Sequence, residues 1–230
     1  MSVLPFHPIR RPPAELHSGD RMSREEFHEI YRRTPESFRA ELIEGIVYVA
    51  SPVGLEHGRS DGLLITVLNV YAFQTPGVEP ATNTTVILGD DSEPQPDVFL
   101  RILPECGGQT RTTSETYVVG APELVAEVAY SSRAIDLGAK QRDYARYGVH
   151  EYLVLSLADQ ELRWFDLRQN RELQIDPDGI LRSQTFPGLW IDRDRLLARD
   201  GPGLMQTLQR GLATPEHAAF VAKLAEARQP

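Results

Sequence analysis

The chain has 230 residues and a formal net charge of −9, from 24 lysines and arginines against 33 aspartates and glutamates. Hydrophobic residues make up 41% and charged residues 25%, which are globular values and exclude disorder, collagen and a coiled coil as descriptions of the whole. The acidic total argues against a nucleic-acid binder held mainly by surface charge, although a local basic groove could coexist with it.

The sequence also bears on compartment and membrane association. Cys106 is the only cysteine, which excludes a disulfide framework and a multi-cysteine zinc site and fits a reducing compartment. The proline-rich start does not resemble a signal peptide, and the longest apolar stretch, residues 63–73, is too short to span a bilayer. We therefore expect a cytoplasmic protein that does not engage a membrane.

Three regions are predicted along the chain. Prolines at positions 5, 8, 12 and 13 prevent a regular element, which predicts a flexible arm over residues 1–20. Residues 21–191 are predicted to form one strand-rich α/β domain, and residues 192–230 a helical C-terminal extension. The chain has no internal repeat and no low-complexity run, so no further unit is needed.

The first predicted elements are a capped helix, a strand pair and a long helix. Ser23 is expected to cap the first helix, with Glu26 reaching back in a capping box. Residues 42–49 have a strand-like pattern with a turn or bulge at residues 44–45. Apolar residues repeat every three or four positions over residues 55–73, which predicts an amphipathic helix.

The rest of the domain is predicted to be mostly strands. These strands cover 78–88, 98–102, 124–130, 151–157, 162–167 and a segment near 180–184, which could extend the hairpin formed by the two strands before it. A loop is predicted over 104–115 and a helix over 134–147, ended by Gly148. Helices follow over 195–198, 204–212 and 216–228. The apolar side of the last helix, with Phe220, Val221 and Leu224, is expected to pack on the core or on a second subunit.

Two acidic residues and a lysine are the strongest candidates for chemistry. Asp97 opens a strand, Glu127 lies inside the nearly apolar strand Leu-Val-Ala-Glu-Val-Ala-Tyr, and Lys140 lies on the following helix. A carboxylate buried among valines and alanines needs a cation, a salt-bridge partner or an edge position. Two carboxylates from adjacent strand ends, with a backbone carbonyl such as that of Val128, would supply hard oxygen ligands for magnesium or manganese. Such an ion stabilises charge in phosphoryl transfer and lowers the pKa of a bound water.

Each candidate also has a structural alternative. Tyr144 shares a helix face with Lys140 but is expected in the core, and His57 could position a phosphate or simply begin a helix. Cys106 lies in a glycine-rich loop with no indication of a base to activate it as a nucleophile. Asp97 could instead be a turn residue that bonds its own backbone. Glu127 could form an ion pair with Arg142 or Arg146. Lys140 could be a solvated helix residue paired with Asp136 or Asp143.

Several well-known catalytic motifs are absent. The sequence contains no Walker loop, Rossmann glycine fingerprint, GxSxG elbow or HExxH, which argues against P-loop hydrolases, dehydrogenases, α/β-hydrolases and zincins.

An ordered set of short segments instead resembles the Uma-type endonuclease family of the PD-(D/E)XK, or restriction-endonuclease-like, superfamily. The resemblance spans roughly residues 22–190, and the ordered set is far more specific than any one segment. The segments are Glu41-Leu42-Ile43-Glu44-Gly45, Ser51-Pro52, Glu56-His57, Gln95-Pro96-Asp97-Val98, Ala121 through Val128, Asp136 through Lys140 to Tyr144, and Tyr147 through Tyr152.

The resemblance implies a mixed central β-sheet flanked by helices and a magnesium-dependent phosphodiesterase site, often in a homodimer. By position, Asp97 and Glu127 match the two metal-binding acids, Lys140 the lysine and Glu41 the upstream acid, with Glu44 as the alternative for that last role. We therefore expect an endonuclease that acts on nucleic acid, with DNA favoured, and that functions as a homodimer.

One departure from the superfamily signature concerns the lysine. The signature puts lysine two residues after the glutamate, where this chain has Ala129, and Lys140 satisfies the Uma-type pattern from the next helix. Arg133 stands where the family tends to have a small hydroxyl residue. The rival hypothesis is a non-catalytic interaction or assembly protein that keeps this fold. The intact acids and lysine favour the enzyme, whereas the net charge of −9 favours the rival.

Overall fold

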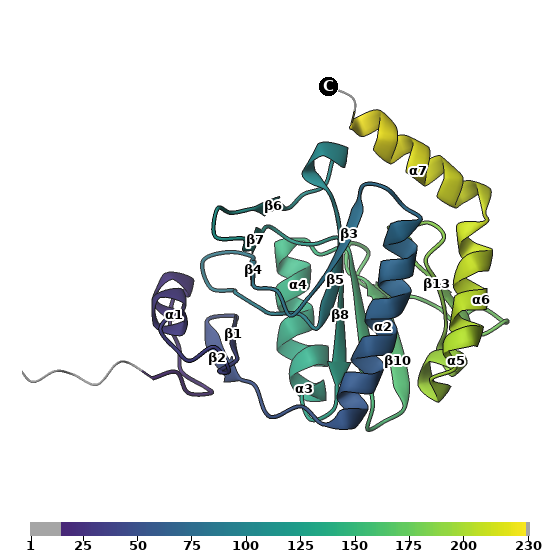
Figure 1. The fold of residues 1–230 in the computed structure, drawn as a ribbon. Coiled ribbons are helices and arrows are strands. Elements are labelled where there is room, and N and C mark those ends of the chain that lie inside the picture. Colours follow the sequence, from purple (N-terminus) through teal and green to yellow (C-terminus); the bar gives the residue numbers. More distant parts are fainter. Residues whose placement is uncertain (1–14, 229–230) are drawn as a thin grey trace, which may run out of the picture.

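The computed structural model describes residues 15–228, and its centre is a six-stranded mixed β-sheet (Figure 1). β8 and β9 run parallel, and the other neighbouring strands pair antiparallel. This architecture confirms the predicted fold class, a mixed α/β sheet flanked by helices. In spatial order the strands are β11 (Arg171–Glu172), β10 (Glu161–Asp166), β9 (Glu151–Ser156), β8 (Leu124–Ala129), β5 (Val98–Ile102) and β3 (Val78–Thr82).

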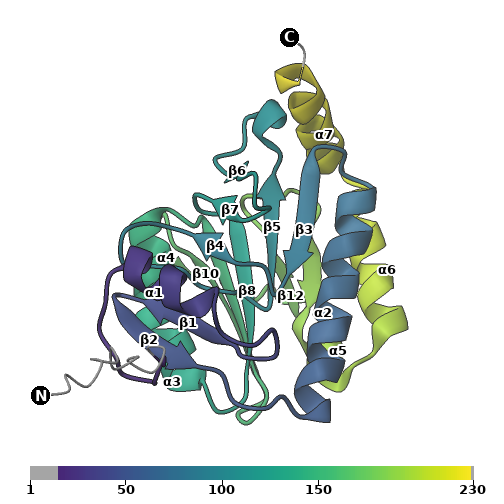
Figure 2. The same cartoon turned by 60° about the vertical axis from the view of Figure 1, so that its left-hand side comes forward.

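Helices cover both faces of this sheet because its central strands are apolar on both sides. Leu124, Ala126 and Val128 of β8 pack in one cluster with helix α2 (Leu55–Phe73), as predicted, and with α6 (Gly201–Leu212). Val125 and Ala129, which point the other way, pack with Tyr144 of helix α4 (Gln141–Tyr147). Figures 1 and 2 show α2 and α4 on opposite sides of β8.

A hairpin and a short helix form a small layer beside the sheet, seen at the front of Figure 2. Strands β1 (Ala40–Ile43) and β2 (Ile46–Val49) join through Glu44 and Gly45, whose φ angles are 50° and 73°. Two positive φ values suit a tight hairpin turn, so the turn predicted at these residues is confirmed. Helix α1 (Arg24–Tyr31) begins at Ser23, whose side chain accepts from the amide of Glu26, as predicted.

The helix predicted over residues 134–147 is present but is not regular throughout. It consists of α3 (Arg133–Ile135), a π-helical turn η2 (Asp136–Lys140) and α4, and it ends at Gly148 with φ of 90°. A π turn inserts an extra residue and so rotates the side chains on either side of it. The spacing of apolar residues in the sequence does not predict a π turn.

Two predicted strands differ from the structure. The segment 78–88 divides at Asn83, where φ is 47°, so β3 joins the central sheet and β4 (Val86–Ile87) joins a separate one. The segment near 180–184 forms β12 (Ile180–Arg182), which pairs with β13 (Trp190–Asp192) and does not extend the 151–167 hairpin. β11 occupies that place because Leu167 and Asn170 turn the chain directly back onto β10. The predicted loop 104–115 contains a short 3-10 helix η1 (Pro104–Cys106) and β6 (Arg111–Thr112), which joins β7 (Val118–Val119).

The C-terminal residues form three helices, α5 (Arg193–Ala198), α6 and α7 (Pro215–Ala227). Leu224 of α7 is buried in the main core, and the ring of Phe220 contacts Phe186 edge to face. The apolar side of α7 therefore needs no second subunit to cover it, and the homodimer stays a prediction.

The start of the predicted arm, residues 1–14, lies outside the described residues. Leu16 is buried beside the β1–β2 hairpin, and the amide of Gly19 donates to the Val47 carbonyl, so the packed part of the chain begins before residue 20. The division into arm, domain and extension stays a prediction. Within residues 15–228, no helix combines the length and the apolar character needed to cross a membrane.

Candidate active site

Asp97 and Glu127 lie opposite each other on neighbouring strands. The antiparallel register pairs Val98 with Ala126, so extending it by one residue places Asp97 across from Glu127. Alternation along each strand turns both side chains toward the helix that carries Lys140. The Asp97 amide nitrogen lies 3.5 Å from Glu127 Oε2, so the structure brings the two residues together.

Asp97 is held as an ionised carboxylate. Its Oδ2 accepts a 2.7 Å hydrogen bond from the Val128 amide and lies 3.6 Å from Nε2 of His57. Burial would raise the pKa of Asp97, but His57, the Val128 amide and Lys140 together outweigh it and lower the pKa below its usual value. In turn, hydrogen bonding to Asp97 raises the pKa of His57.

Lys140 is the centre of the charge network. Its Nζ lies 2.8 Å from Glu41 Oε2, 2.9 Å from Glu127 Oε1 and 3.8 Å from Asp136 Oδ1, with only 7% of the side chain exposed. Burial would lower the pKa of Lys140, but these carboxylates overcome it and raise the pKa well above the usual value. The solvated alternative for Lys140 is therefore wrong, because the side chain is buried among acids.

Glu127 is the most enclosed of the acids. Its Oε1 accepts from Lys140 and also from the hydroxyl of Tyr144 at 2.8 Å, and 4% of its side chain is exposed. Burial raises the pKa of Glu127 well above normal, and the neighbouring carboxylates add to this while Lys140 opposes it. The lone carboxylate of the apolar strand thus has a cation, as its burial requires.

Of the two candidates for the upstream acid, the structure brings only Glu41 to Lys140. The Glu41 side chain leaves β1 toward the site, where its Oε1 accepts a 2.7 Å hydrogen bond from the amide of Gln95. Glu44, at the hairpin turn, forms an exposed ion pair with Arg142 at 2.8 Å. The hairpin thus separates two glutamates only three positions apart.

The structural alternative for Glu127 is also wrong. Arg142 is engaged by Glu44, and Arg146 contacts Asp91 and Asp143 at 2.7 and 2.6 Å. Cys106, in η1, is buried against the main core and does not line the site.

Two residues have larger parts in the site than the sequence indicated. Tyr144 is a core residue, as expected, yet its hydroxyl reaches Glu127. Asp136 is 2% exposed, and its Oδ2 has no hydrogen-bond partner within residues 15–228. The shared helix face of Asp136, Lys140 and Tyr144 was the one sequence signal for both.

The four acids and Lys140 line the floor of an open cavity of about 690 Å³. The first turn of α2, the end of β2 and the segment after β8 form its walls, and His57 lies among them. The volume is large enough for a nucleotide-sized ligand, since small-molecule sites commonly measure about 300–1,000 Å³.

The donor chemistry of the floor fits a hard divalent cation. Four carboxylates, those of Glu41, Asp97, Glu127 and Asp136, share one buried lysine, which leaves an excess of negative charge in a poorly hydrated place. In the described part of the chain, no three His, Cys, Asp or Glu side chains form a complete metal cage. Two carboxylates suffice for magnesium, which keeps several waters and takes further oxygens from substrate phosphates.

A family model and a solved structure are similar to this chain. A family model described as "Uma2: Putative restriction endonuclease" matches residues 24–194, which is more than half of the chain. The chain is also similar to the crystal structure of "a putative nuclease belonging to DUF820" from Anabaena variabilis ATCC 29413, with a TM-score of 0.59 and 14% identity. That similarity covers 74% of this chain and 96% of the other, and it concerns the fold alone. No curated protein matches the chain.

Proposed function

Since this chain belongs to the Uma2 family, we propose that it is a metal-dependent endonuclease that hydrolyses phosphodiester bonds in nucleic acid, with DNA favoured. The observation that carries the proposal is the pairing of Asp97 with Glu127 beside buried Lys140, at the floor of an open cavity. Buried charges of this kind lower the stability of a fold unless they are compensated, which makes a purely structural purpose a poor explanation.

Asp97 and Glu127, with the backbone carbonyl of Val128, would hold a magnesium or manganese ion. When bound, such an ion polarises the phosphate and lowers the pKa of a coordinated water, which supplies the nucleophile at neutral pH. Asp97 suits this part because its pKa is already low, so the carboxylate is ionised and ready to bind. Glu127 needs the nearby positive charge to ionise, because burial raises its pKa.

Lys140 would stabilise the charge that develops on the phosphate. Its ammonium is fixed by Glu41 and Glu127, so little reorganisation is needed when the negative charge grows. Glu41 in turn is fixed by the Gln95 amide and keeps Lys140 protonated. Glu41 would assist the site through Lys140 and through water.

The proposal extends to the assembly and the location of the protein. We propose a homodimer, which the resemblance to the Uma-type family implies, and a cytoplasmic location, for which the single cysteine is the support. Neither the homodimer nor the cytoplasmic location depends on the chemistry of the site.

The proposal is tested by incubating the protein with labelled DNA and RNA, single- and double-stranded, with Mg²⁺, with Mn²⁺ and with a chelator. Cleavage that requires metal and is lost in Asp97→Asn is expected. A folded wild type that cleaves none of these substrates, and whose melting temperature does not respond to millimolar Mn²⁺, would leave the non-catalytic interaction protein as the better explanation.

A further inference from the structure

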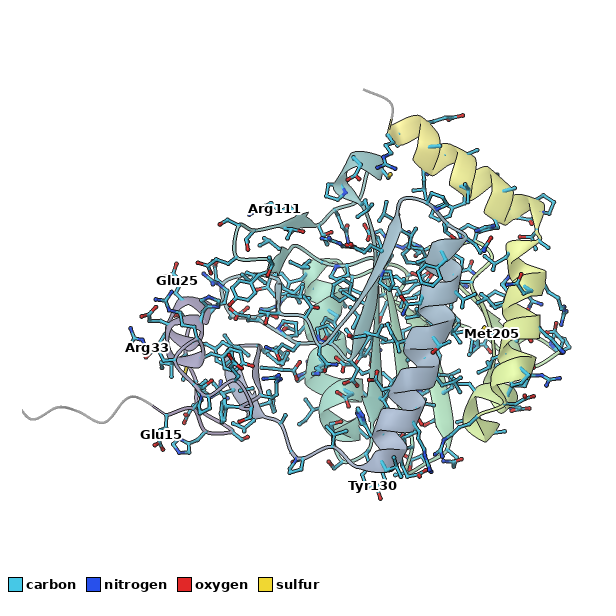
Figure 3. All side chains as sticks on the ribbon, in the orientation of Figure 1. Glu15, Glu25, Arg33, Arg111, Tyr130 and Met205 are labelled. Atoms are coloured by element: carbon cyan, nitrogen blue, oxygen red, sulfur yellow. The ribbon has the colours of Figure 1, made fainter. Side chains whose placement is uncertain are left out.

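The rim of the active-site cavity differs in character from its charged floor. Tyr130, directly after β8, is 64% exposed, and Val53 and Leu55, at the start of α2, are 68% and 69% exposed. All three line the same cavity as Asp97 and Glu127. Figure 3 shows Tyr130 at the lower edge of the molecule, by the first turn of α2. Large apolar side chains that gather in solvent around a site indicate a surface that binds something.

Positive charge is scarce at this rim. Among the residues that line the cavity, Lys140 is held by Glu41 and Glu127, and His57 contacts Asp97. Arg39 lines the cavity, is exposed and forms no ion pair with any residue of 15–228; its guanidinium only donates to backbone carbonyls such as that of Phe38, at 3.0 Å. The cavity lining therefore offers one arginine without an ion pair, Arg39, and one exposed aromatic ring, Tyr130.

We infer that the nucleic acid enters this site as an unpaired strand, with a base stacked on Tyr130 and a neighbouring phosphate bound by Arg39. Duplex binders depend on neutralising several phosphates, for which one free arginine is too few. An unpaired strand exposes the faces of its bases, and stacking on an aromatic side chain tolerates any sequence. Tyr130 follows Glu127 by three residues, so a stacked base would lie close to the scissile phosphate. This inference rests on the proposed function and narrows its substrate to an unpaired strand of nucleic acid.

The duplex competes poorly for a second reason. In a duplex the faces of the bases are already stacked on one another, so Tyr130, Val53 and Leu55 would meet the sugar-phosphate backbone. Apolar side chains gain nothing from contact with phosphates, whereas they can pack against the exposed bases of a single strand. Single strands are therefore expected to bind more tightly than the same sequence in a duplex.

The test is the binding of a fluorescently labelled single-stranded oligonucleotide and of its duplex to the full chain, by anisotropy in a chelator, so that no cleavage occurs. The variants are Tyr130→Ala and Tyr130→Phe, with Phe73→Ala as matched control. Phe73 is 76% exposed, at the far end of α2, and does not line the cavity. Arg39→Gln is compared with Arg111→Gln, an exposed arginine on β6 outside the cavity (Figure 3).

We expect single-strand affinity to fall about tenfold in Tyr130→Ala and to stay near wild type in Tyr130→Phe and Phe73→Ala. In Arg39→Gln the slope of log K against log salt should become shallower by about 0.7, and in Arg111→Gln it should not change. Tighter binding of the duplex, or equal binding by wild type and Tyr130→Ala, overturns the inference. Either result leaves the proposed function intact if Asp97-dependent cleavage is still seen, whereas the loss of all cleavage in wild type is the failure of the function itself.

Discussion

The ammonium of Lys140 lies 2.9 Å from Oε1 of Glu127, although the two residues are 13 positions apart in the chain. In the superfamily signature the lysine follows the glutamate on the same strand, where this chain has Ala129. In this chain the positive charge comes from the helix that packs over β8 and not from the strand itself. The π turn η2 of that helix ends at Lys140. In this chain the ion pair between Glu127 and Lys140 is thus built by the packing of a helix on β8.

The first prediction concerns the charge of Lys140. Lys140→Met keeps the volume but leaves Glu41 and Glu127 without their cation, which should cost about 3–5 kcal/mol of folding free energy. Lys140→Arg should cost less, because it keeps the charge. Cleavage in Lys140→Met should fall about 100- to 1,000-fold.

A bound metal ion should partly replace the positive charge that Lys140→Met removes. The melting temperature of Lys140→Met should therefore rise more on adding Mn²⁺ than that of wild type, since binding to the native state stabilises it by mass action. Thermal melts with and without metal measure this. An equal rise in both proteins would show that the ion does not interact with the carboxylates that contact Lys140.

The second prediction separates two buried tyrosines. Tyr144→Phe removes a hydrogen bond to Glu127 and should lower the unfolding free energy by about 1.5–3 kcal/mol, the usual range for a bond to a charged group. The matched control is Tyr152→Phe, because the buried Tyr152 hydroxyl has no partner within residues 15–228. Removing the Tyr152 hydroxyl should leave the free energy of unfolding unchanged or increase it. Urea unfolding of both variants provides the comparison, and equal losses of stability would count against a bond from Tyr144.

The two glutamates of the hairpin provide a third prediction. Glu41→Gln should reduce the cleavage rate about 10- to 100-fold, as is usual for residues that orient a metal site through another group. Glu44→Gln should leave the rate unchanged and alter stability by at most about 1 kcal/mol, because its ion pair with Arg142 is exposed. Single-turnover cleavage is the measurement. A larger loss in Glu44→Gln would reverse the assignment.

The sequence was sufficient for most elements of the fold because their signals are local. The turn at Glu44 and Gly45 and the cap at Ser23 follow from short-range chemistry, and both are present. The partner of β12 could not be predicted, because strand pairing beyond a hairpin depends on tertiary packing. The structure divides β3 from β4 at Asn83, a residue type that tolerates positive φ, but the threonines beside it are typical of strands and conceal that signal.

For the candidate site, the residues could be predicted but their arrangement could not. Asp97, Glu127 and Lys140 follow from the strand pattern and the resemblance, and the structure brings them together; their roles stay a prediction. The choice of Glu41 over Glu44 depends on the direction of β1 relative to the sheet. The hydroxyl of Tyr144 reaches Glu127 because of packing between α4 and β8, which helical periodicity alone does not specify.

A fourth prediction concerns pH and the C-terminal helix. His217 of α7 is buried, with Nδ1 3.0 Å from the Leu212 carbonyl and Nε2 2.9 Å from the hydroxyl of Thr75. Burial lowers the pKa of His217 from 6.5, so the unfolded chain binds a proton that the folded chain does not. The contribution of His217 to the free energy of unfolding is therefore fully present above pH 6.5. It is lost as the pH falls from 6.5 toward the lowered pKa of His217 in the folded chain.

His217→Asn keeps a polar group near Leu212 but does not titrate. Between pH 8 and pH 5.5 its melting temperature should fall less than that of wild type, whatever its value at pH 8. Parallel slopes for the two proteins would mean that His217 is not the group that takes up the proton.

The central claim is that Asp97 and Glu127 form a metal-dependent hydrolytic site with Lys140. Its most direct test is the single-turnover cleavage rate of labelled single-stranded DNA by wild type and Asp97→Asn at saturating Mn²⁺, with melts to show that both are folded. We predict strand breaks by wild type that disappear with a chelator, and at least a 100-fold lower rate in Asp97→Asn, about the loss of one preorganised charge-stabilising group. Equal rates for the two proteins, or wild-type cleavage that persists in the chelator, would contradict the claim.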